Sequence, residues 1–284
     1  HKYRIKDVDD EINNLGRSIN VMSDKLERTI NQLRNSNIEL EKDIEEKSKI
    51  DEMRKSFISD VSHELKTPIA LIQGYSEGLL ENVNTDEESR KFYAEVILDE
   101  TNKMDKLVKQ LLELMKLEYG KRQFNDKKFN IVEVEKEVVR KSKVMLEEKK
   151  VKIEFNLSEE INVFADDFYI EQVISNYITN AIKHVKEIDG KKVISIVNEV
   201  NIEKNKVRVK IFNTGENIAE EHINRIWNRF YKVDSSRNRE AGGSGIGLAL
   251  VKAIMNNYQN YYGVVNKEDG VEFYFDLDLE MEKA

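Results

Sequence analysis

The sequence predicts two kinds of domain in one chain: an α-helical hairpin that pairs with a second copy into a four-helix bundle, then a two-layer α/β sandwich. Up to about residue 120, apolar residues recur at steps of three and four, which is the period of a helix. Beyond Gly120, strand-like alternation mixes with helical periods without strict βαβ order. At 284 residues, the chain is long enough for more than one domain.

Composition excludes several classes of protein. The chain has 35% charged residues, which favours a soluble, helix-rich protein, and its net charge of −8 comes without a concentrated basic stripe, which argues against a nucleic-acid partner. It has no cysteine, so disulfides, thiolate metal sites and cysteine catalysis are excluded. No window approaches the ~18 apolar residues that span a bilayer, so we expect no transmembrane helix or signal peptide in these residues.

The first helix is expected from Glu11 to Asn35, where apolar residues form a coiled-coil or bundle seam. These residues are Ile12, Leu15, Ile19, Met22, Leu26, Ile30 and Leu33. The polar run Asn35–Asn37 and the later positions of Leu40 and Ile44 predict a change of register, as a stutter produces.

The hairpin is expected from two later amphipathic stretches on either side of a loop at Asn82–Glu87. The second stretch runs from Phe92 to Met115. The first contains Pro68, the sole proline, which should bend or loosen the helix just after His63. Two such helices have too little mass to bury their apolar faces, so pairing with a second copy is the natural solution.

The α/β part is divided by the same reasoning. Strands are expected at Phe129–Val132, Val151–Asn156, Val193–Val200, Lys206–Phe212, Tyr261–Asn266 and Val271–Asp278. Helices are expected at Val134–Lys149, Asp167–Val185 and Ile246–Tyr258.

A reactive group is predicted on the first hairpin helix. Residues four apart share a helix face, so Thr67 lies near His63, and Glu64 can reach the ring by swinging its side chain. For a lone histidine, a solvated surface position is the alternative.

A second site is predicted where glycines precede an apolar helix. Gly243, Gly245 and Gly247 leave backbone amides unhindered just before Leu248, where a helix N-terminus can hold a polyphosphate. A flexible loop is the alternative, and the lack of a preceding strand or of a Gly-Lys-Ser/Thr ending counts against Rossmann and Walker sites.

A polar face on the helix Asp167–Val185 is the third feature. Asn176, Asn180 and Lys183 recur at steps of four and three, so they point the same way. The Asn180 amide oxygen is of the type that Mg²⁺ accepts when phosphate oxygens and waters complete its octahedron. A solvated polar face is the alternative.

Five segments in this order resemble the H, N, G1, F and G2 boxes of sensor histidine kinases. They are Phe57–Ile69, Asn176–His184, Asn213–Gly215, Arg229–Tyr231 and Gly242–Leu248. The resemblance implies an ATP-binding fold of the kind found in Hsp90, MutL and histidine kinases. It also divides the chain into a HAMP remnant with a signalling coiled coil at 1–50, a dimerisation and histidine phosphotransfer hairpin at 51–120, and a catalytic ATP-binding domain at 121–284. An ordinary coiled coil is the alternative for the first part.

The resemblance implies ATP and Mg²⁺ as cofactors and gives each nucleotide-site residue a role. Asn180 holds the metal, while the phosphates touch Asn176, Lys183 and His184. Asn213 stands where the family has an aspartate that reads adenine, and its amide can accept from the adenine amino group and donate to a ring nitrogen. The remaining nucleotide residues are Gly215, Arg229, Tyr231, Gly243, Gly245, Gly247 and Leu248.

Two further sets of residues are expected to shape the site. Residues 227–241 read as a lid over the nucleotide, with Arg229 and Arg237 near the γ-phosphate; a solvated basic loop is the alternative for Arg237. Tyr258–Asn260 and Asn266 also depart from the family, at positions expected to be structural.

The resemblance implies a homodimer that transfers the γ-phosphoryl of ATP to His63 and then to an aspartate of a response-regulator receiver domain. Glu64 would fix the imidazole tautomer, and Thr67 would serve dephosphorylation of the regulator.

The expected location is the cytoplasmic part of a membrane protein, whose anchor is an N-terminal segment missing here. The rivals are another ATPase or serine kinase on the same fold, and a weak scaffold or phosphatase caused by Asn213. The stimulus, the regulator's identity and cis or trans phosphorylation cannot be read from residues.

Overall fold

The structure is a computed structural model that describes residues 11–83, 86–118, 124–156, 160–233 and 244–279. The chain divides into two compact units, residues 1–63 and 64–284. Among the described helices, none combines the length and the apolar composition needed to cross a membrane.

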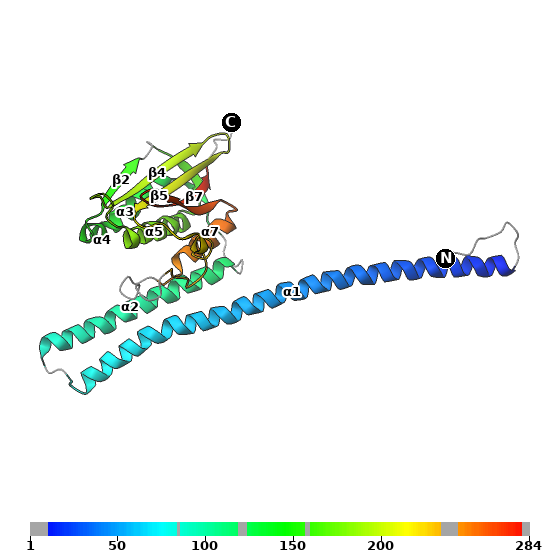
Figure 1. The fold of residues 1–284 in the computed structure, drawn as a ribbon, viewed down its shortest axis with the longest axis horizontal. Helices are drawn as coiled ribbons and strands as arrows, with labels where there is room; N and C mark the ends of the chain where they lie inside the picture. Colours follow the sequence, from blue (N-terminus) through cyan, green and yellow to red (C-terminus); the bar gives the residue numbers. More distant parts are fainter. Residues whose placement is uncertain (1–10, 84–85, 119–123, 157–159, 234–243, 280–284) are drawn as a thin grey trace. The chain divides into compact units, whose positions relative to one another are not determined.

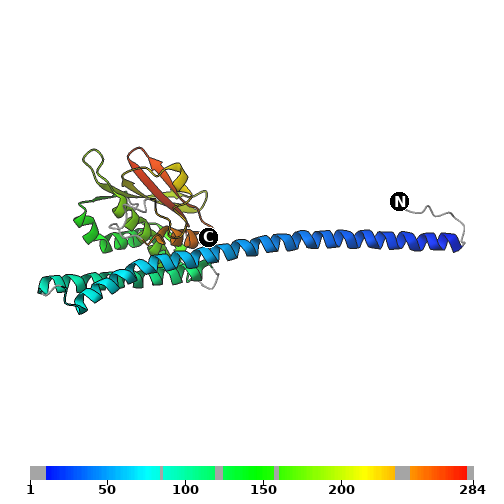
Figure 2. The ribbon, with the colours of Figure 1, turned by 60° about the horizontal axis from the view of Figure 1, so that its bottom comes forward.

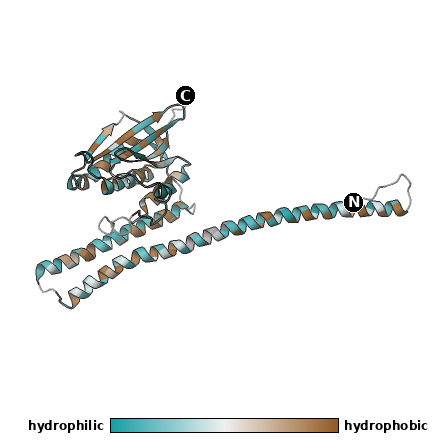
Figure 3. Ribbon diagram, in the orientation of Figure 1, coloured by the Kyte–Doolittle hydropathy of each residue, from teal (hydrophilic) through white to brown (hydrophobic). Residues whose placement is uncertain are grey.

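Helix α1 runs from Glu11 to Leu80 and belongs to both units (Figure 1). This confirms the first expected helix, and no break occurs at the polar run near residue 36. Its seven seam residues in the first unit are 48–71% exposed. Figure 3 shows hydrophobic positions recurring along a mostly hydrophilic helix. A single copy of α1 therefore leaves its apolar seam uncovered.

Pro68 is accommodated inside α1, because the helix continues beyond it to Leu80. The helix is therefore not interrupted after His63, and the bend expected there stays a prediction. Proline removes one backbone donor, and the hydrogen bonds of the neighbouring turns keep the helix continuous.

Helix α2, Glu87–Glu118, forms the second arm of the hairpin and confirms the second amphipathic stretch. It begins where the Asp86 carboxylate accepts the backbone N–H of Ser89 at 2.7 Å. Near the turn, the Tyr75 and Tyr93 rings meet edge to face with centroids 4.9 Å apart. Gly78 makes this packing possible, since a Cβ there would lie 2.7 Å from the Tyr93 ring.

The α/β part contains a five-stranded mixed sheet in the order β2-β4-β5-β7-β6. Its strands are β2 (Lys152–Asn156), β4 (Val193–Asn201), β5 (Lys206–Thr214), β6 (Tyr262–Lys267) and β7 (Gly270–Asp278). β2 and β4 pair in parallel, while the other neighbours are antiparallel. The five strands were expected from the sequence within two residues at each end.

Helices form the second layer, against one face of the sheet (Figures 1 and 2). They are α3 (Ile131–Lys141), α4 (Lys143–Glu148), α5 (Asp167–His184), α6 (Glu220–Ile223) and α7 (Gly247–Asn257). α5 carries the largest buried face, including the fully buried Tyr169 and Tyr177. The two-layer α/β sandwich is therefore confirmed.

Three local expectations were wrong around α3. Strand β1 (Lys127–Asn130) ends before Ile131, because the Asn130 side chain accepts the Val132 N–H at 3.1 Å and caps α3. The single helix expected up to residue 149 is split at Ser142, whose hydroxyl bonds back to Val138 O. Strand β3 (Asn162–Ala165) was not expected; it pairs along its length with β1, and Val163 forms a single further bridge to Leu279.

The C-terminal turns of α2 join the core of the α/β part. Leu107, Leu114 and Leu117 are buried, and the Asn257 amide of α7 donates to Leu117 O at 3.2 Å. The hairpin thus packs directly beside the helix that follows the glycine loop.

Candidate active site

The expected phosphoacceptor lies on α1. His63 and Thr67 are exposed residues of this helix, while Glu64 is half-buried. Both Glu64 carboxylate oxygens accept from Lys232 Nζ, at 3.0 and 3.1 Å. The predicted hydrogen bond between Glu64 and the His63 ring is therefore not present, because a cation from the nucleotide domain occupies the carboxylate.

The N-box helix and the glycine loop meet at Gly247. A Cβ on Gly247 would lie 2.6 Å from Asn176 Oδ1, so only glycine permits this approach. The other end of the Asn176 amide donates to Gln172 O at 2.8 Å, which fixes the direction of its oxygen. Residues 71 positions apart in the sequence thus meet where α5 approaches the start of α7.

The F segment, Arg229–Tyr231, is hydrogen-bonded to the same glycine loop. The Phe230 N–H donates to Gly245 O at 2.8 Å. Gly245 has φ +68°, and a Cβ there would lie 2.7 Å from Phe230 Cα. Glycine is required at 245 by its left-handed conformation and by this contact. Gly243 lies outside the described residues.

The G1 segment closes against the end of α5. A Cβ on Gly215 would lie 2.8 Å from His184 O, and the Lys186 N–H donates to Thr214 O at 2.9 Å. The structure therefore brings Asn176, His184, Gly215, Gly245 and Gly247 into one region.

Asn213 is 3% exposed at the end of β5. Its amide nitrogen donates to Thr214 O at 3.1 Å, and among the described residues no hydrogen bond uses its oxygen. The Asn213 amide oxygen is therefore available to accept from adenine, whereas one of its two N–H groups already donates to the backbone.

The electrostatics of the site favour an anion. Burial lowers the pKa of Lys183, and the like charges of Lys106, Lys149 and Lys232 lower it further. A polyphosphate would relieve this repulsion between cations. Sequence reasoning missed these three lysines. Lys232 could have been found directly after Arg229–Tyr231, whereas Lys106 and Lys149 approach only through the tertiary fold.

His184 sits beside the same charges. Desolvation lowers its pKa, and Lys183, Lys149 and Lys186 lower it further. Both effects disfavour a charged imidazole at this position.

Two expected nucleotide residues are engaged with protein groups. Arg229 pairs with Glu118 of α2, with its Nε 3.1 Å from Oε1. The Tyr231 hydroxyl is 2.7 Å from His222 Nδ1, and Arg225 stacks 4.7 Å above the ring centroid. Neither side chain is directed at the glycine loop by these contacts.

The Leu248 side chain packs against the hydrophobic core. It is a half-buried residue packed against the apolar cluster. Its position directly after Gly247 anchors the first turn of α7.

Trp227, the first residue of the expected lid, has a structural role. Trp227 is 9% exposed and packs edge to face on Tyr262, with centroids 4.9 Å apart. It therefore belongs to the core. Residues 234–243, including Arg237, lie outside the described residues.

The family departures at Asn266 and Gln259 have structural roles. The Asn266 amide accepts the Ile218 N–H at 2.9 Å and donates to Ile218 O at 2.7 Å, closing the loop after the G1 segment. Gln259 takes φ +54°, a conformation that glycine adopts without strain.

The residues present fit a magnesium ion that is held mainly by phosphate. Asn180 is half-buried on α5, and no hydrogen bond between described residues uses its side chain. The described part of the chain also has no cluster of three His, Asp or Glu able to hold a metal by itself. Mg²⁺ commonly takes one or two protein ligands when substrate phosphates supply others.

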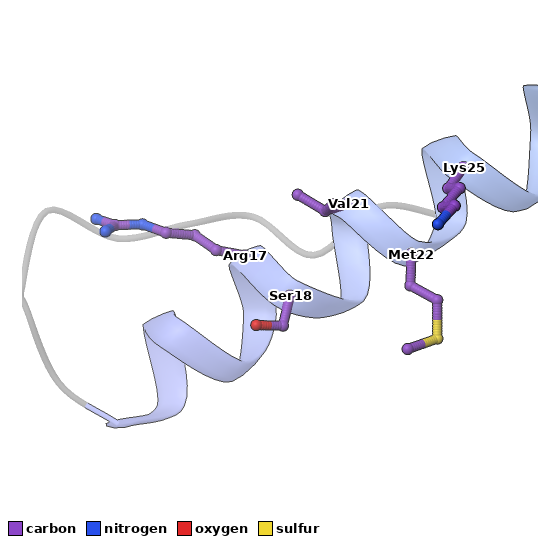
Figure 4. A pocket seen from close by; sticks show the side chains of 5 residues that line it. All are labelled: Arg17, Ser18, Val21, Met22 and Lys25. Carbon is purple, nitrogen blue, oxygen red and sulfur yellow. The ribbon is translucent and has the colours of Figure 1, made fainter.

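A hollow of about 520 Å³ lies elsewhere, on α1 in the first unit (Figure 4). It is lined by Arg17, Ser18, Val21, Met22 and Lys25. These residues occupy one side of a single helix and include none of the predicted site residues.

Fold and site together define a helical phosphoacceptor hairpin joined to an ATP-binding domain. A family model described as the His Kinase A (phospho-acceptor) domain matches residues 53–120. A second, described as the histidine kinase-, DNA gyrase B- and HSP90-like ATPase, matches residues 165–281. The chain belongs to the sensor histidine kinases.

A curated relative is the sensor protein SrrB of Staphylococcus aureus strain N315, which is 31% identical over 217 residues. The match covers 76% of this chain and 36% of SrrB, so the chain spans about a third of that relative's length.

Two solved structures share the fold. The Acinetobacter baumannii histidine kinase AdeS matches with TM-score 0.64 and 25% identity, covering 77% of this chain and 98% of AdeS. Histidine kinase ThkA, in complex with the response regulator protein TrrA, matches with TM-score 0.61 and 26% identity, covering 81% of this chain and 63% of ThkA.

Proposed function

We propose that this chain binds ATP with Mg²⁺ and transfers the γ-phosphoryl group to His63, from which it passes to an aspartate of a response-regulator receiver domain. The observation that carries this proposal is the close approach of α5, the F segment and the glycine loop beside Lys183, whose pKa is lowered by burial and by the nearby Lys106, Lys149 and Lys232. Such a group of cations beside a helix N-terminus favours a polyanion.

The nucleotide would use residues from three elements. Asn180 holds Mg²⁺ together with phosphate oxygens, while Asn176, Lys183 and His184 contact the phosphates. The amide oxygen of Asn213 accepts from the adenine amino group. Mg²⁺ supplies charge neutralisation for the γ-phosphoryl group.

In the transfer, a neutral nitrogen of His63 forms a bond to the γ-phosphorus as the bond to the bridging oxygen of ADP breaks. Glu64 accepts a hydrogen bond from the other ring nitrogen, which fixes the tautomer and increases nucleophilicity. In the structure this carboxylate is bonded to Lys232, and for this role one of its oxygens would turn toward the His63 ring.

The partners follow from the same reaction. ThkA is titled as a complex with a response regulator, and we propose the same class of partner here. Thr67, one turn beyond His63, would position the water that hydrolyses the regulator's phosphoaspartate.

We also propose a homodimer with the organisation predicted above. Residues 1–50 form a HAMP remnant and signalling coiled coil, 51–120 the phosphotransfer hairpin and 121–284 the ATP-binding domain. The exposed seam of α1 supports pairing with a second copy. In the full-length protein, an N-terminal segment would anchor this cytoplasmic portion to the membrane.

Incubation with γ-labelled ATP and Mg²⁺ tests the function. We expect acid-labile, base-stable label on the parent chain and none on His63→Gln, which keeps nucleotide binding. Acid-stable label would indicate a hydroxyl acceptor, and label on His63→Gln would overturn the assignment. Asn180→Ala should lose Mg²⁺-dependent labelling while remaining dimeric.

The second candidate is a catalytically weak scaffold or phosphatase, favoured by the committed amide of Asn213. Asn213→Asp distinguishes the two. Because a carboxylate makes the stronger hydrogen bond, by about 1 kcal/mol, we expect labelling at low ATP equal to or faster than the parent. A large loss would mean that the pocket depends on the amide. An unlabelled parent that Asn213→Asp restores would support the scaffold.

A further inference from the structure

The C-terminal half of α2 reaches the loops of the nucleotide site. Leu114 and Leu117 are buried, the Leu117 carbonyl accepts from Asn257 of α7, and the Ser244 hydroxyl at the edge of the glycine loop is 3.0 Å from Gln110 Oε1. Side chains at the end of α2 are therefore fixed next to groups that a nucleotide would use.

Glu118, the last residue of α2, holds Arg229 with both carboxylate oxygens. One contact joins Nε to Oε1 at 3.1 Å, and the second joins Nη2 to Oε2. The two side chains are only 27% and 30% exposed, so solvent screens the pair incompletely. A bidentate guanidinium–carboxylate pair has the same fork geometry that arginine uses for phosphate.

Arg229 stands directly before Phe230, whose backbone is bonded to Gly245 of the glycine loop. The Arg229 guanidinium is therefore carried by a segment that is hydrogen-bonded to the glycine loop. Because Glu118 occupies the Nε/Nη2 edge of the guanidinium, Arg229 cannot offer that edge to a phosphate at the same time.

We propose that Glu118 is an autoinhibitory latch, which holds Arg229 away from the γ-phosphate until the end of α2 and the F segment separate. This rests on the proposed nucleotide function. A triphosphate competes with Glu118 for Arg229, whereas a diphosphate lacks the group that competes. By linkage, release of the latch strengthens triphosphate binding, and triphosphate binding favours release by the same factor.

The test compares two nucleotides on the full chain. Calorimetry with Mg²⁺ measures the Kd of the non-hydrolysable ATP analogue AMP-PNP and of ADP for the parent and for Glu118→Gln. We expect AMP-PNP to bind about fivefold tighter to the variant, within the usual range of such couplings, with little change for ADP. Glu118→Ala should give the same selective tightening.

Asp105→Asn is the matched control, because Asp105 pairs with Lys109 on the exposed side of α2 at 2.7 Å. It should change neither Kd. Equal shifts for ADP and AMP-PNP, or no shift for either Glu118 variant, would overturn the latch. A parent chain that binds neither nucleotide would instead refute the proposed function, and the latch with it.

Discussion

At the scale of single residues, Glu135 is a carboxyl group buried in the α/β core with an incomplete set of partners. It is 0% exposed, and its Oε2 accepts from the Asn198 amide at 3.0 Å. Glu135 Oε1 and Asn198 Oδ1 are both buried without a hydrogen bond among the described residues. A proton on Glu135 would satisfy both oxygens, as a paired acid and amide. Desolvation accordingly raises its pKa to about 7.

This buried acid predicts a pH-dependent stability. The folded pKa of about 7 lies above the ordinary 4.5, so the folded state keeps a proton that the unfolded state loses. Stability therefore falls as pH rises from about 4.5 to about 7, by about 3 kcal/mol, and this group adds no further change above that window.

Glu135→Gln should remove this loss of stability at higher pH, since the glutamine amide can pair with Asn198 at every pH. Urea unfolding measures the free energy of unfolding of both proteins at pH 5 and pH 8. The difference between variant and parent should be larger at pH 8 than at pH 5, in favour of the variant, by a few kcal/mol. Glu137→Gln is the control, because Glu137 lies on the same helix in an exposed pair with Arg140. A gain that is the same at both pH values would contradict a protonated Glu135.

Thr67 offers a test that separates two activities of one helix. In the proposed mechanism, its exposed hydroxyl would position the water that attacks the regulator's phosphoaspartate and would take no part in phosphoryl transfer to His63. Thr67→Ala should keep autophosphorylation and slow dephosphorylation of the regulator at least tenfold, which is about 1.4 kcal/mol of barrier. Both rates are measured on one preparation, and equal loss of the two would indicate a structural role beside Pro68.

At the scale of elements, the nucleotide site depends on how closely α5 approaches α7. Only the missing side chain of Gly247 leaves room for the Asn176 amide oxygen. The sequence predicted that both residues contact phosphate, but it gave no sign that one glycine sets the distance between the two helices.

Gly247→Ala should therefore weaken AMP-PNP binding at least tenfold, because the new methyl group displaces Asn176, at a cost of about 1–3 kcal/mol. Titration calorimetry measures it. Gly74→Ala is the control: a Cβ at Gly74 meets nothing within 4 Å, so this change should leave binding unaltered and raise stability by up to about 1 kcal/mol. Parental affinity in Gly247→Ala would show that the close approach is dispensable.

At the scale of the whole molecule, the proposed dimer rests on the exposed apolar seam of α1. Its apolar side chains lie on one side of a helix and are exposed by about half or more. Such a contiguous apolar stripe marks an interaction surface, and a second copy of the same helix matches its spacing.

The double variant Ile19→Glu and Leu26→Glu should raise the dimer Kd at least tenfold in sedimentation experiments, since each change buries a charge in the seam. Gln32→Glu adds a charge off the seam and should leave the Kd unchanged. A monomeric parent chain, or a double variant that dimerises as the parent does, would contradict this pairing.

The sequence by itself determined the class of fold, the order of the boxes and most helix and strand positions, because hydrophobic period and glycine spacing are local properties. It could not place the split at Ser142, where one hydroxyl bonds back to the helix. Nor could it find β3, a four-residue strand that exists through its partner strand.

The tertiary structure decided which charges meet. Lys106 and Lys149 act on Lys183 from distant helices, Glu64 is bonded to Lys232, and Glu118 holds Arg229 across 111 residues of sequence. Electrostatic interactions depend on distance and on burial, and neither is a property of the local sequence. The residue types at the site were thus readable in advance, while their pairing became visible only when the elements packed.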